Sequence, residues 1–92
     1  MMTAKEARAN TEAQITKIAK EFIINNVGQA VQEAIDSGHF YATVSFEGVP
    51  NPETIGPEVV KQLETYGYRA KHTYHNDHGY SNYISVYWED ED

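Results

Sequence analysis

The sequence YRAKHTYHNDHGYSNYISVYWE, residues 68–89, decides the fold. Residues 68–74 and 83–89 each alternate between two kinds of side chain, which is the period of a half-buried β-strand. Residues 75–79 between them are rich in turn formers, so we predict a hairpin. The side chains predicted to face the core are Tyr68, Ala70, His72, Tyr74, Ile84, Val86 and Trp88.

Working toward the N-terminus, a further helix and strand precede this hairpin. Residues 57–66 predict a short helix, because Pro57 suits a first helical position and Gly67 a stop. Residues 48–56, with two prolines, predict a loop. Residues 39–47 alternate cleanly and predict another strand. The apolar positions of these two elements are Phe40, Ala42, Val44, Phe46, Val59, Val60, Leu63 and Tyr66.

The first third of the chain predicts one long helix. Two segments have the spacing of a capping box, Thr3 with Glu6 and Thr11 with Gln14, and either could begin it. An apolar stripe at helical spacing runs from Ile15 to Ile35. Gly28 lowers the helix propensity in the middle of this segment. We therefore expect one long helix, and Gly28 is the position at which it could bend. Gly38 is a natural residue to end it.

The predicted class is α+β: a long helix, then β-α-β-β in a single domain of residues 1–92. A right-handed crossover followed by a hairpin places the last strand in the middle of a mixed or antiparallel sheet, in the order 1-3-2. The helices cover one face of the sheet and leave the other open. Residues 1–10 could form a separate helical turn or arm, and residues 89–92 an acidic tail.

Composition limits the classes of function. The net charge of −7 falls to −3 when the four acids of residues 89–92 are left out. Direct binding to nucleic acid is therefore not expected. The chain has no cysteine, no signal-like segment and no apolar run of membrane length. We expect a cytoplasmic protein without cofactor that self-associates, because 92 residues bury only a modest core.

Four segments carry a resemblance. The opening MTAKEAR of residues 2–8 resembles the start of many small phage-encoded proteins of unassigned function. Residues 34–40, residues 59–68 and residues 84–88 are similar to their helix stop, their glycine-tyrosine step and their closing aromatic strand. The resemblance implies a protein of the host cytoplasm that binds host proteins, and it brings no catalytic residues. The Tyr/His-rich hairpin of residues 74–83 departs from that pattern.

The open face of the predicted sheet is the main candidate site. It would carry an aromatic and basic set of side chains: Tyr41, Arg69, Lys71, Tyr83 and Tyr87. Aromatic residues and arginine are frequent anchors of protein interfaces. The same set could stack a nucleobase and contact a phosphate. Tyrosines are also common strand residues without any further role.

Metal binding and catalysis have little support in the sequence. His75, Asp77 and His78 could meet within the hairpin turn as metal ligands, but a polar turn explains them equally well. His72 should not join them, because residues three apart on a strand point to opposite faces. Cysteine nucleophiles, phosphate-binding loops and nucleophile elbows are absent from the sequence, so we do not expect an enzyme.

The long helix is the second candidate surface, because it exceeds the length of the predicted strands. We expect its stripe near Ile15, Ile18 and Phe22 to be covered, either by residues 3–10 folding back or by a second subunit.

Together with the resemblance, these features predict a phage accessory protein that modulates or inhibits a host or phage protein. The alternatives are a protein that sequesters a nucleotide signal of host defence, and a structural homo-oligomer.

Overall fold

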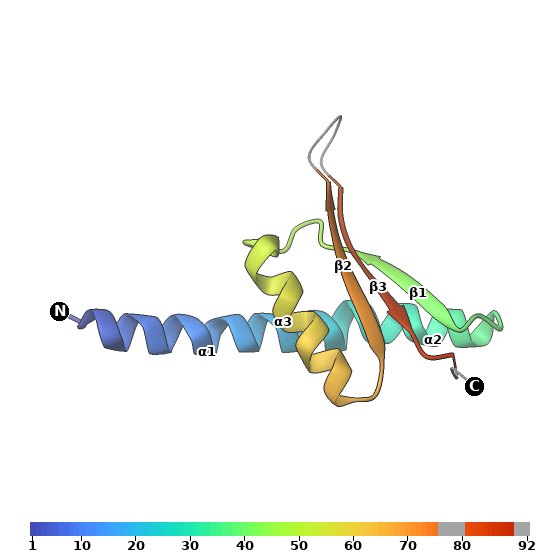
Figure 1. Cartoon of the computed structure of the whole chain (residues 1–92), viewed down its shortest axis with the longest axis horizontal. Helices are drawn as coiled ribbons and strands as arrows, with labels where there is room; N and C mark the ends of the chain where they lie inside the picture. Colours follow the sequence, from blue (N-terminus) through green and yellow to red (C-terminus); the bar gives the residue numbers. More distant parts are fainter. Residues whose placement is uncertain (76–80, 90–92) are drawn as a thin grey trace.

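The computed structural model describes residues 1–75 and 81–89 and has the predicted α+β architecture (Figure 1). Its elements follow the order helix, strand, helix, strand, strand. The long helix lies behind a three-stranded antiparallel sheet, and the second helix packs on the same side of that sheet. The molecule extends 53 Å along its longest axis, which is the direction of the long helix.

The long helix is continuous but changes its winding in the middle. It consists of α1 (Ala4–Phe22), a π-helical segment η1 (Ile23–Val27) and α2 (Gly28–Asp36). The Gly28 amide donates to the Ile23 carbonyl, five residues back. The irregularity is therefore a π segment that ends before Gly28, and not a bend at Gly28. Because a π turn takes up an extra residue, Phe22 and Val27, five apart, both reach the core.

Local signals fix the two ends of this helix. Thr3 is the N-cap, and its hydroxyl accepts a 3.2 Å hydrogen bond from the Glu6 amide. The second predicted capping box, Thr11 with Gln14, does not begin a helix, because Thr11 lies inside α1. Gly38, with a φ of 78°, ends the helix as predicted. The His39 amide donates to the Ala34 carbonyl in the wrap typical of a glycine stop.

The sheet has the predicted strand order. It contains β1 (Tyr41–Ser45), β2 (Arg69–His75) and β3 (Ser81–Tyr87), ordered β1-β3-β2. Both pairings are antiparallel, so β3 hydrogen-bonds to a neighbour on each side. Ile84 and Val86 of this central strand are fully buried. One face of the sheet is turned to the helices, and the other is open.

The prediction of a loop over residues 48–56 is wrong at its end. Helix α3 (Pro52–Thr65) begins five residues earlier than predicted, with Pro52 at its start and Pro57 inside it. Asn51 adopts a left-handed conformation (φ 51°), and its carbonyl accepts the amides of Thr54 and Ile55. Because the helix starts early, Ile55 is buried to 1% exposure. Burying this side chain stabilises the folded state by about 1.5–3 kcal/mol, which offsets much of the cost of the proline inside the helix.

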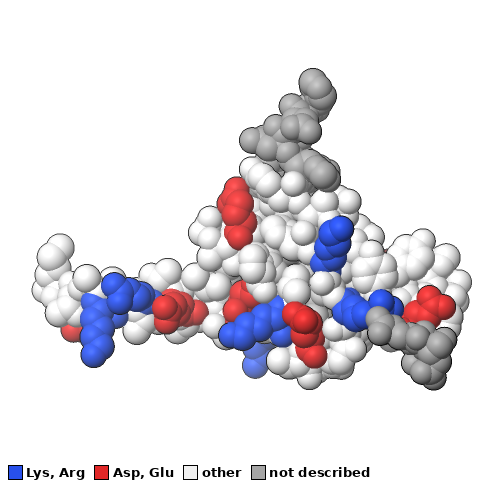
Figure 2. Space-filling model, in the orientation of Figure 1, with Lys and Arg blue, Asp and Glu red and all other residues white. Residues whose placement is uncertain are grey.

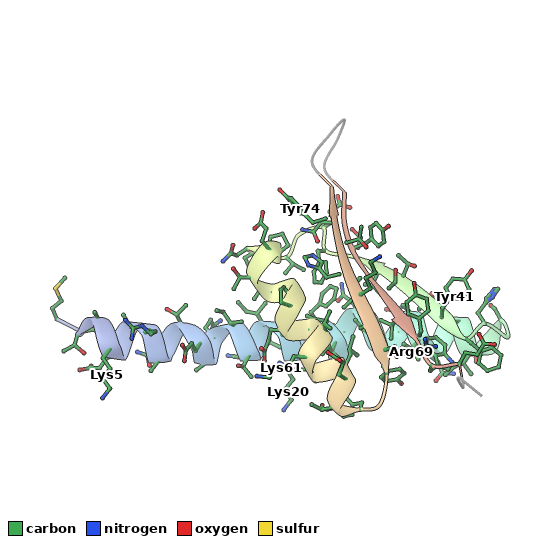
Figure 3. The ribbon with its side chains drawn as sticks, in the orientation of Figure 1. Lys5, Lys20, Tyr41, Lys61, Arg69 and Tyr74 are labelled. Carbon is green, nitrogen blue, oxygen red and sulfur yellow. The ribbon has the colours of Figure 1, made fainter. Side chains whose placement is uncertain are left out.

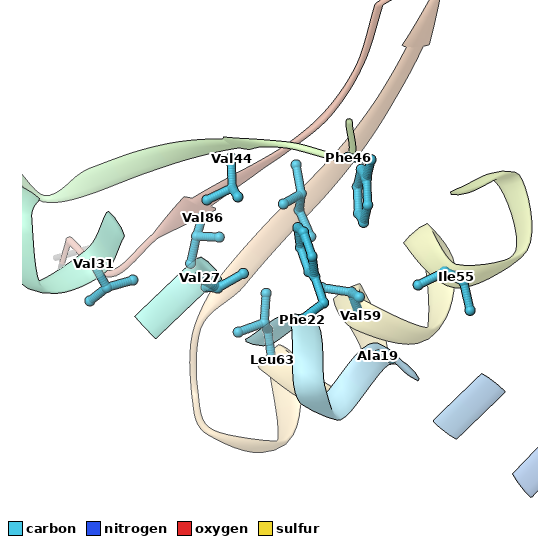
Figure 4. Close-up of a cluster of buried hydrophobic side chains, with 11 residues drawn as sticks. Ala19, Phe22, Val27, Val31, Val44, Phe46, Ile55, Val59, Leu63 and Val86 are labelled. Carbon is cyan, nitrogen blue, oxygen red and sulfur yellow. The ribbon is translucent and has the colours of Figure 1, made fainter. Parts of the chain in front are cut away.

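The core lies between the sheet, α3 and the middle of the long helix (Figure 4). The rings of Phe22 and Phe46 stack at its centre with centroids 4.7 Å apart. Three side chains predicted to face the core are exposed instead: Phe40 (56%), Tyr66 (71%) and Tyr74 (41%). Each lies at or near an end of its element, away from the helices and strands that enclose the core. The main core residues are Ala19, Phe22, Val27, Val31, Val44, Phe46, Ile55, Val59, Leu63, Ile84 and Val86.

Candidate functional site

The open face of the sheet carries its side chains in three rows that cross all three strands. Strand register places the residues of each row side by side, in the order β1, β3, β2. The first row is Tyr41, Tyr87 and Arg69. The second is Thr43, Ser85 and Lys71, and the third is Ser45, Tyr83 and Thr73.

The first row brings three of the five predicted site residues together. The Arg69 guanidinium carbon lies 5.9 Å from the centroid of the Tyr87 ring, within cation–π range. Its Nη2 also donates to the Glu89 carbonyl over 3.3 Å. Tyr41 lies opposite Tyr87 across the strand pair, and the His39 ring tilts against it at 5.6 Å. The side chains of this row are therefore exposed but held by contacts with their neighbours. Figure 3 labels two of them, Tyr41 and Arg69.

The other two predicted residues do not join this cluster. Tyr83 is four residues from Tyr87 along β3, a separation of roughly 13 Å. It is half-buried between Ser45 and Thr73. Lys71 is exposed in the middle row, beside Ser85. The structure thus divides the predicted set into an aromatic and basic row, a basic residue next to it, and a separate tyrosine.

The charge of this face differs from that of the chain. Arg69 and Lys71 are the charged residues of the three rows, although the net charge of the chain is −7. Glu47 and Glu89 continue the outward alternation beyond the ends of β1 and β3. The visible surface carries basic and acidic side chains, several of them next to one another, and shows no continuous basic area (Figure 2). Such a surface is poorly matched to the regular phosphates of a nucleic acid.

A partly buried polar pair, His72 with the buried Asn82, lies on the opposite face of the sheet. His72 Nε2 and Asn82 Oδ1 form a short hydrogen bond at 2.5 Å, between β2 and β3. The His72 ring packs edge-on against Phe46 and directly over the backbone of Gly56 in α3. Asn82 and Gly56 are not among the residues predicted from the sequence. The available signals were an amide directly before a predicted strand, and a glycine three residues before Val59, the first apolar residue of the predicted helix.

The hairpin metal hypothesis falls mostly outside the described residues. Asp77, His78 and the side chain of His75 lie outside them. His72 points to the core, as its strand position predicted. Among the described residues, no group of three His, Asp or Glu side chains is arranged to hold a metal ion.

The predicted stripe on the long helix is covered differently from the expectation. Phe22 is 5% exposed and packs in the core of its own chain, so the prediction that residues 3–10 or a second subunit cover it is wrong. Helix α3 packs against α1 here and half-buries Ile15 and Ile18. The Gln62 side chain ties the two helices by donating to the Thr16 carbonyl over 3.1 Å. Residues 4–10 do not fold back but extend the same helix.

Two apolar grooves flank the long helix. The first, of about 460 Å³, lies between the N-terminal part of α1 and the start of α3, with Ile15, Ile18, Pro50 and Ile55 in its walls. The second, of about 370 Å³, lies between α2 and the end of α3 and is lined by Ile35, Tyr66 and Tyr68, among others.

Comparisons with known proteins leave the site to be interpreted from its own geometry. No family model, no curated protein and no solved structure matches the chain. In the part of the chain that the structure describes, no helix combines the length and the apolar character needed to cross a membrane.

Proposed function

We propose that this chain is a protein-binding module that contacts its partner through the first row of the open sheet face, Tyr41, Tyr87 and Arg69. In this proposal it is a phage accessory protein in the host cytoplasm, where it modulates or inhibits a host or phage protein without chemistry of its own. The observation that carries the proposal is the ordered aromatic and basic row on an uncovered sheet.

The physical properties of the row suit an interface. Tyrosine and arginine are enriched among the residues that dominate binding energy. Arg69 is already held by the Tyr87 ring and the Glu89 carbonyl, so it loses less conformational freedom on binding than a free arginine. With Lys71 next to it, the row favours a partner surface that offers carboxylates or carbonyl oxygens.

A nucleotide ligand is the second candidate, because the Tyr41 and Tyr87 rings could stack a base. The geometry favours a protein partner over it. The row is flat and open, whereas small ligands are usually enclosed in a concave site. None of the grooves described above is lined by Tyr41, Tyr87 or Arg69.

The test compares tyrosines on different surfaces. Partners are captured from bacterial lysate, and the recovered protein is purified for affinity measurements. We expect Tyr87→Ala and Arg69→Ala each to raise the Kd at least about tenfold, the range of an interface anchor. Tyr66→Ala, which removes another exposed tyrosine ring away from the sheet face, should leave the Kd unchanged.

The outcomes separate the two candidates. If the wild type and a Tyr41/Tyr83/Tyr87-to-Ala variant bind the purified partner equally well, the proposed face is wrong. A nucleotide panel is screened in parallel by thermal shift, because a tight ligand raises the Tm by mass action. A Tm increase that disappears in Tyr87→Ala would move the assignment to a nucleotide.

A further inference from the structure

The N-terminal part of α1 projects from the body of the molecule as a single helix (Figure 1). We call residues 4–14 the arm. Every residue of the arm is exposed, and the first half-buried position after it is Ile15. Eleven helical residues correspond to roughly 16 Å of helix. The arm needs no nucleation of its own, because it continues a helix that is anchored in the core.

One side of the arm is apolar and continues into a groove. Ala7, Thr11, Ile15 and Ile18 are spaced four, four and three residues apart and line the first groove, of about 460 Å³. Ala4 precedes them on the same side, by helical spacing. Pro50 and Asn51, directly before α3, and Ile55 in its first turn form the opposite wall. The groove therefore lies beside the arm and is large enough to accept apolar side chains from a second helix.

Thr11 is the polar residue of this stripe, and its hydroxyl already has a hydrogen-bond partner in its own helix. The Thr11 hydroxyl donates to the Ala7 carbonyl of its own helix over 2.8 Å. Its hydrogen-bonding capacity as a donor is met internally, and its methyl group is left to pack. Burying Thr11 against another apolar surface therefore carries little of the usual penalty for a hydroxyl.

We propose that the arms of two copies of this chain pair antiparallel, each lying in the groove of the other, about a two-fold axis at Thr11. In that register Ala4 of one copy lies opposite Ile18 of the second, and Ala7 lies opposite Ile15. On both sides of the axis small side chains thus face large ones, which lets the two helices approach closely. A two-fold interface needs only this one self-complementary surface.

The charges of the arm agree with this register. Arg8 and Glu12 lie on the same flank of the stripe, by their helical spacing. In an antiparallel pair, this flank of one arm faces the same flank of the other. Arg8 then comes within a turn of Glu12 of the second copy, and the contact repeats by symmetry. In a parallel pairing the two copies of this flank would lie on opposite sides of the interface, so Arg8 would not meet Glu12 of the second copy.

The proposal predicts an elongated dimer with both sheet faces free. Each copy is 53 Å long, and an overlap of 15 residues takes up roughly 22 Å, so the dimer measures about 80 Å. The proposal is independent of the function assigned to the open sheet face.

Disulfide trapping tests the register directly, because the chain has no cysteine of its own. Thr11→Cys places two thiols at the axis, and mild oxidation should convert most of the protein to a covalent dimer. Ala9→Cys is the matched control, since it is equally exposed on the same arm but points away from the stripe. If Cys at position 9 cross-links as readily as Cys at position 11, the register is wrong.

Sedimentation tests the interface without a cross-link. We expect Ala7→Glu to raise the dimer dissociation constant at least about tenfold. Ala9→Glu adds the same side chain to the other side of the arm and should leave the constant nearly unchanged. Arg8→Glu should weaken the dimer, and Arg8→Glu combined with Glu12→Arg should restore it. Circular dichroism confirms that each variant is folded.

Two further results would overturn the proposal. One is a wild-type chain that sediments as a monomer up to about 1 mM, where an interface of only about 4 kcal/mol would already be half occupied. The other is a dimer that Ala7→Glu and Ala9→Glu affect equally.

Discussion

Replacing Phe22 with alanine should lower the free energy of unfolding by about 3–5 kcal/mol, the largest effect that we expect from one substitution. Phe22 is 5% exposed, and its ring stacks on Phe46 at the junction of helix and sheet. The substitution leaves a cavity that the surrounding side chains cannot fill without moving two elements. In a domain of this size, such a loss approaches the total stability.

Chemical denaturation checks this prediction, with the free energy taken from the midpoint and slope of the urea transition. Ile24→Ala is the control, because Ile24 lies two residues away in η1 but is 63% exposed. Its unfolding free energy should change by less than about 0.5 kcal/mol. A Phe22→Ala variant as stable as Ile24→Ala would show that Phe22 is not part of the core, and would return it to the candidates for an interface.

Gly56→Ala should destabilise the protein by about 1–3 kcal/mol, although alanine is the better helix former. A Cβ atom at position 56 would lie 2.6 Å from Nδ1 and from Cε1 of His72, and 2.8 Å from Cγ. These atoms belong to a rigid ring, so no flexible end can move aside. The ring is also held by Asn82 and Phe46.

The same substitution at a second glycine gives the matched control. Gly28 lies within the long helix in a right-handed conformation, and a Cβ there meets only the Ile23 carbonyl at 3.4 Å. Gly28→Ala should therefore stabilise by about 0.5–1 kcal/mol. Opposite signs at the two glycines would establish that close packing, and not helix propensity, decides position 56.

A double-mutant cycle assigns the cause of the Gly56 effect. His72→Ala removes the ring that the new methyl group would meet. In the His72→Ala background, Gly56→Ala should be less destabilising by about 1–2 kcal/mol, the coupling expected for residues in direct contact. Additive effects would mean that the clash with His72 does not determine the result.

The structure places the two candidate surfaces on different parts of the molecule. The first row of the sheet face lies on β1, β2 and β3, whereas the arm belongs to α1 and extends away from the sheet (Figure 1). Self-association and partner binding would therefore not compete. A dimer would also present two sheet faces at once, and such bivalency raises the apparent affinity for a partner that can engage both.

Several elements could be predicted because their signals are local. The Thr3 N-cap and the Gly38 stop depend on hydrogen bonds and dihedral angles within a few residues. The alternation in residues 41–45 and 83–87 placed the correct side chains inward. Strand order followed from the handedness of the crossover and the hairpin.

Other features could not be predicted because they depend on residues distant in the sequence. Helix α3 begins at Pro52 because its early start carries Ile55 into contact with the core. Phe40 and Tyr66 have the right period for burial but are exposed, because none of the described helices and strands lies over them. The grouping of Tyr41, Tyr87 and Arg69, and the separation of Tyr83, follow from strand register.

The sequence by itself determined the kind and order of the elements and the residues of the open sheet face, because periodicity and capping are properties of short segments. The tertiary structure decided which of those side chains meet, which apolar positions remain exposed, and that the arm projects beside an open groove. Burial depends on what another part of the chain covers, and that information is present only once the helices and the sheet have packed together.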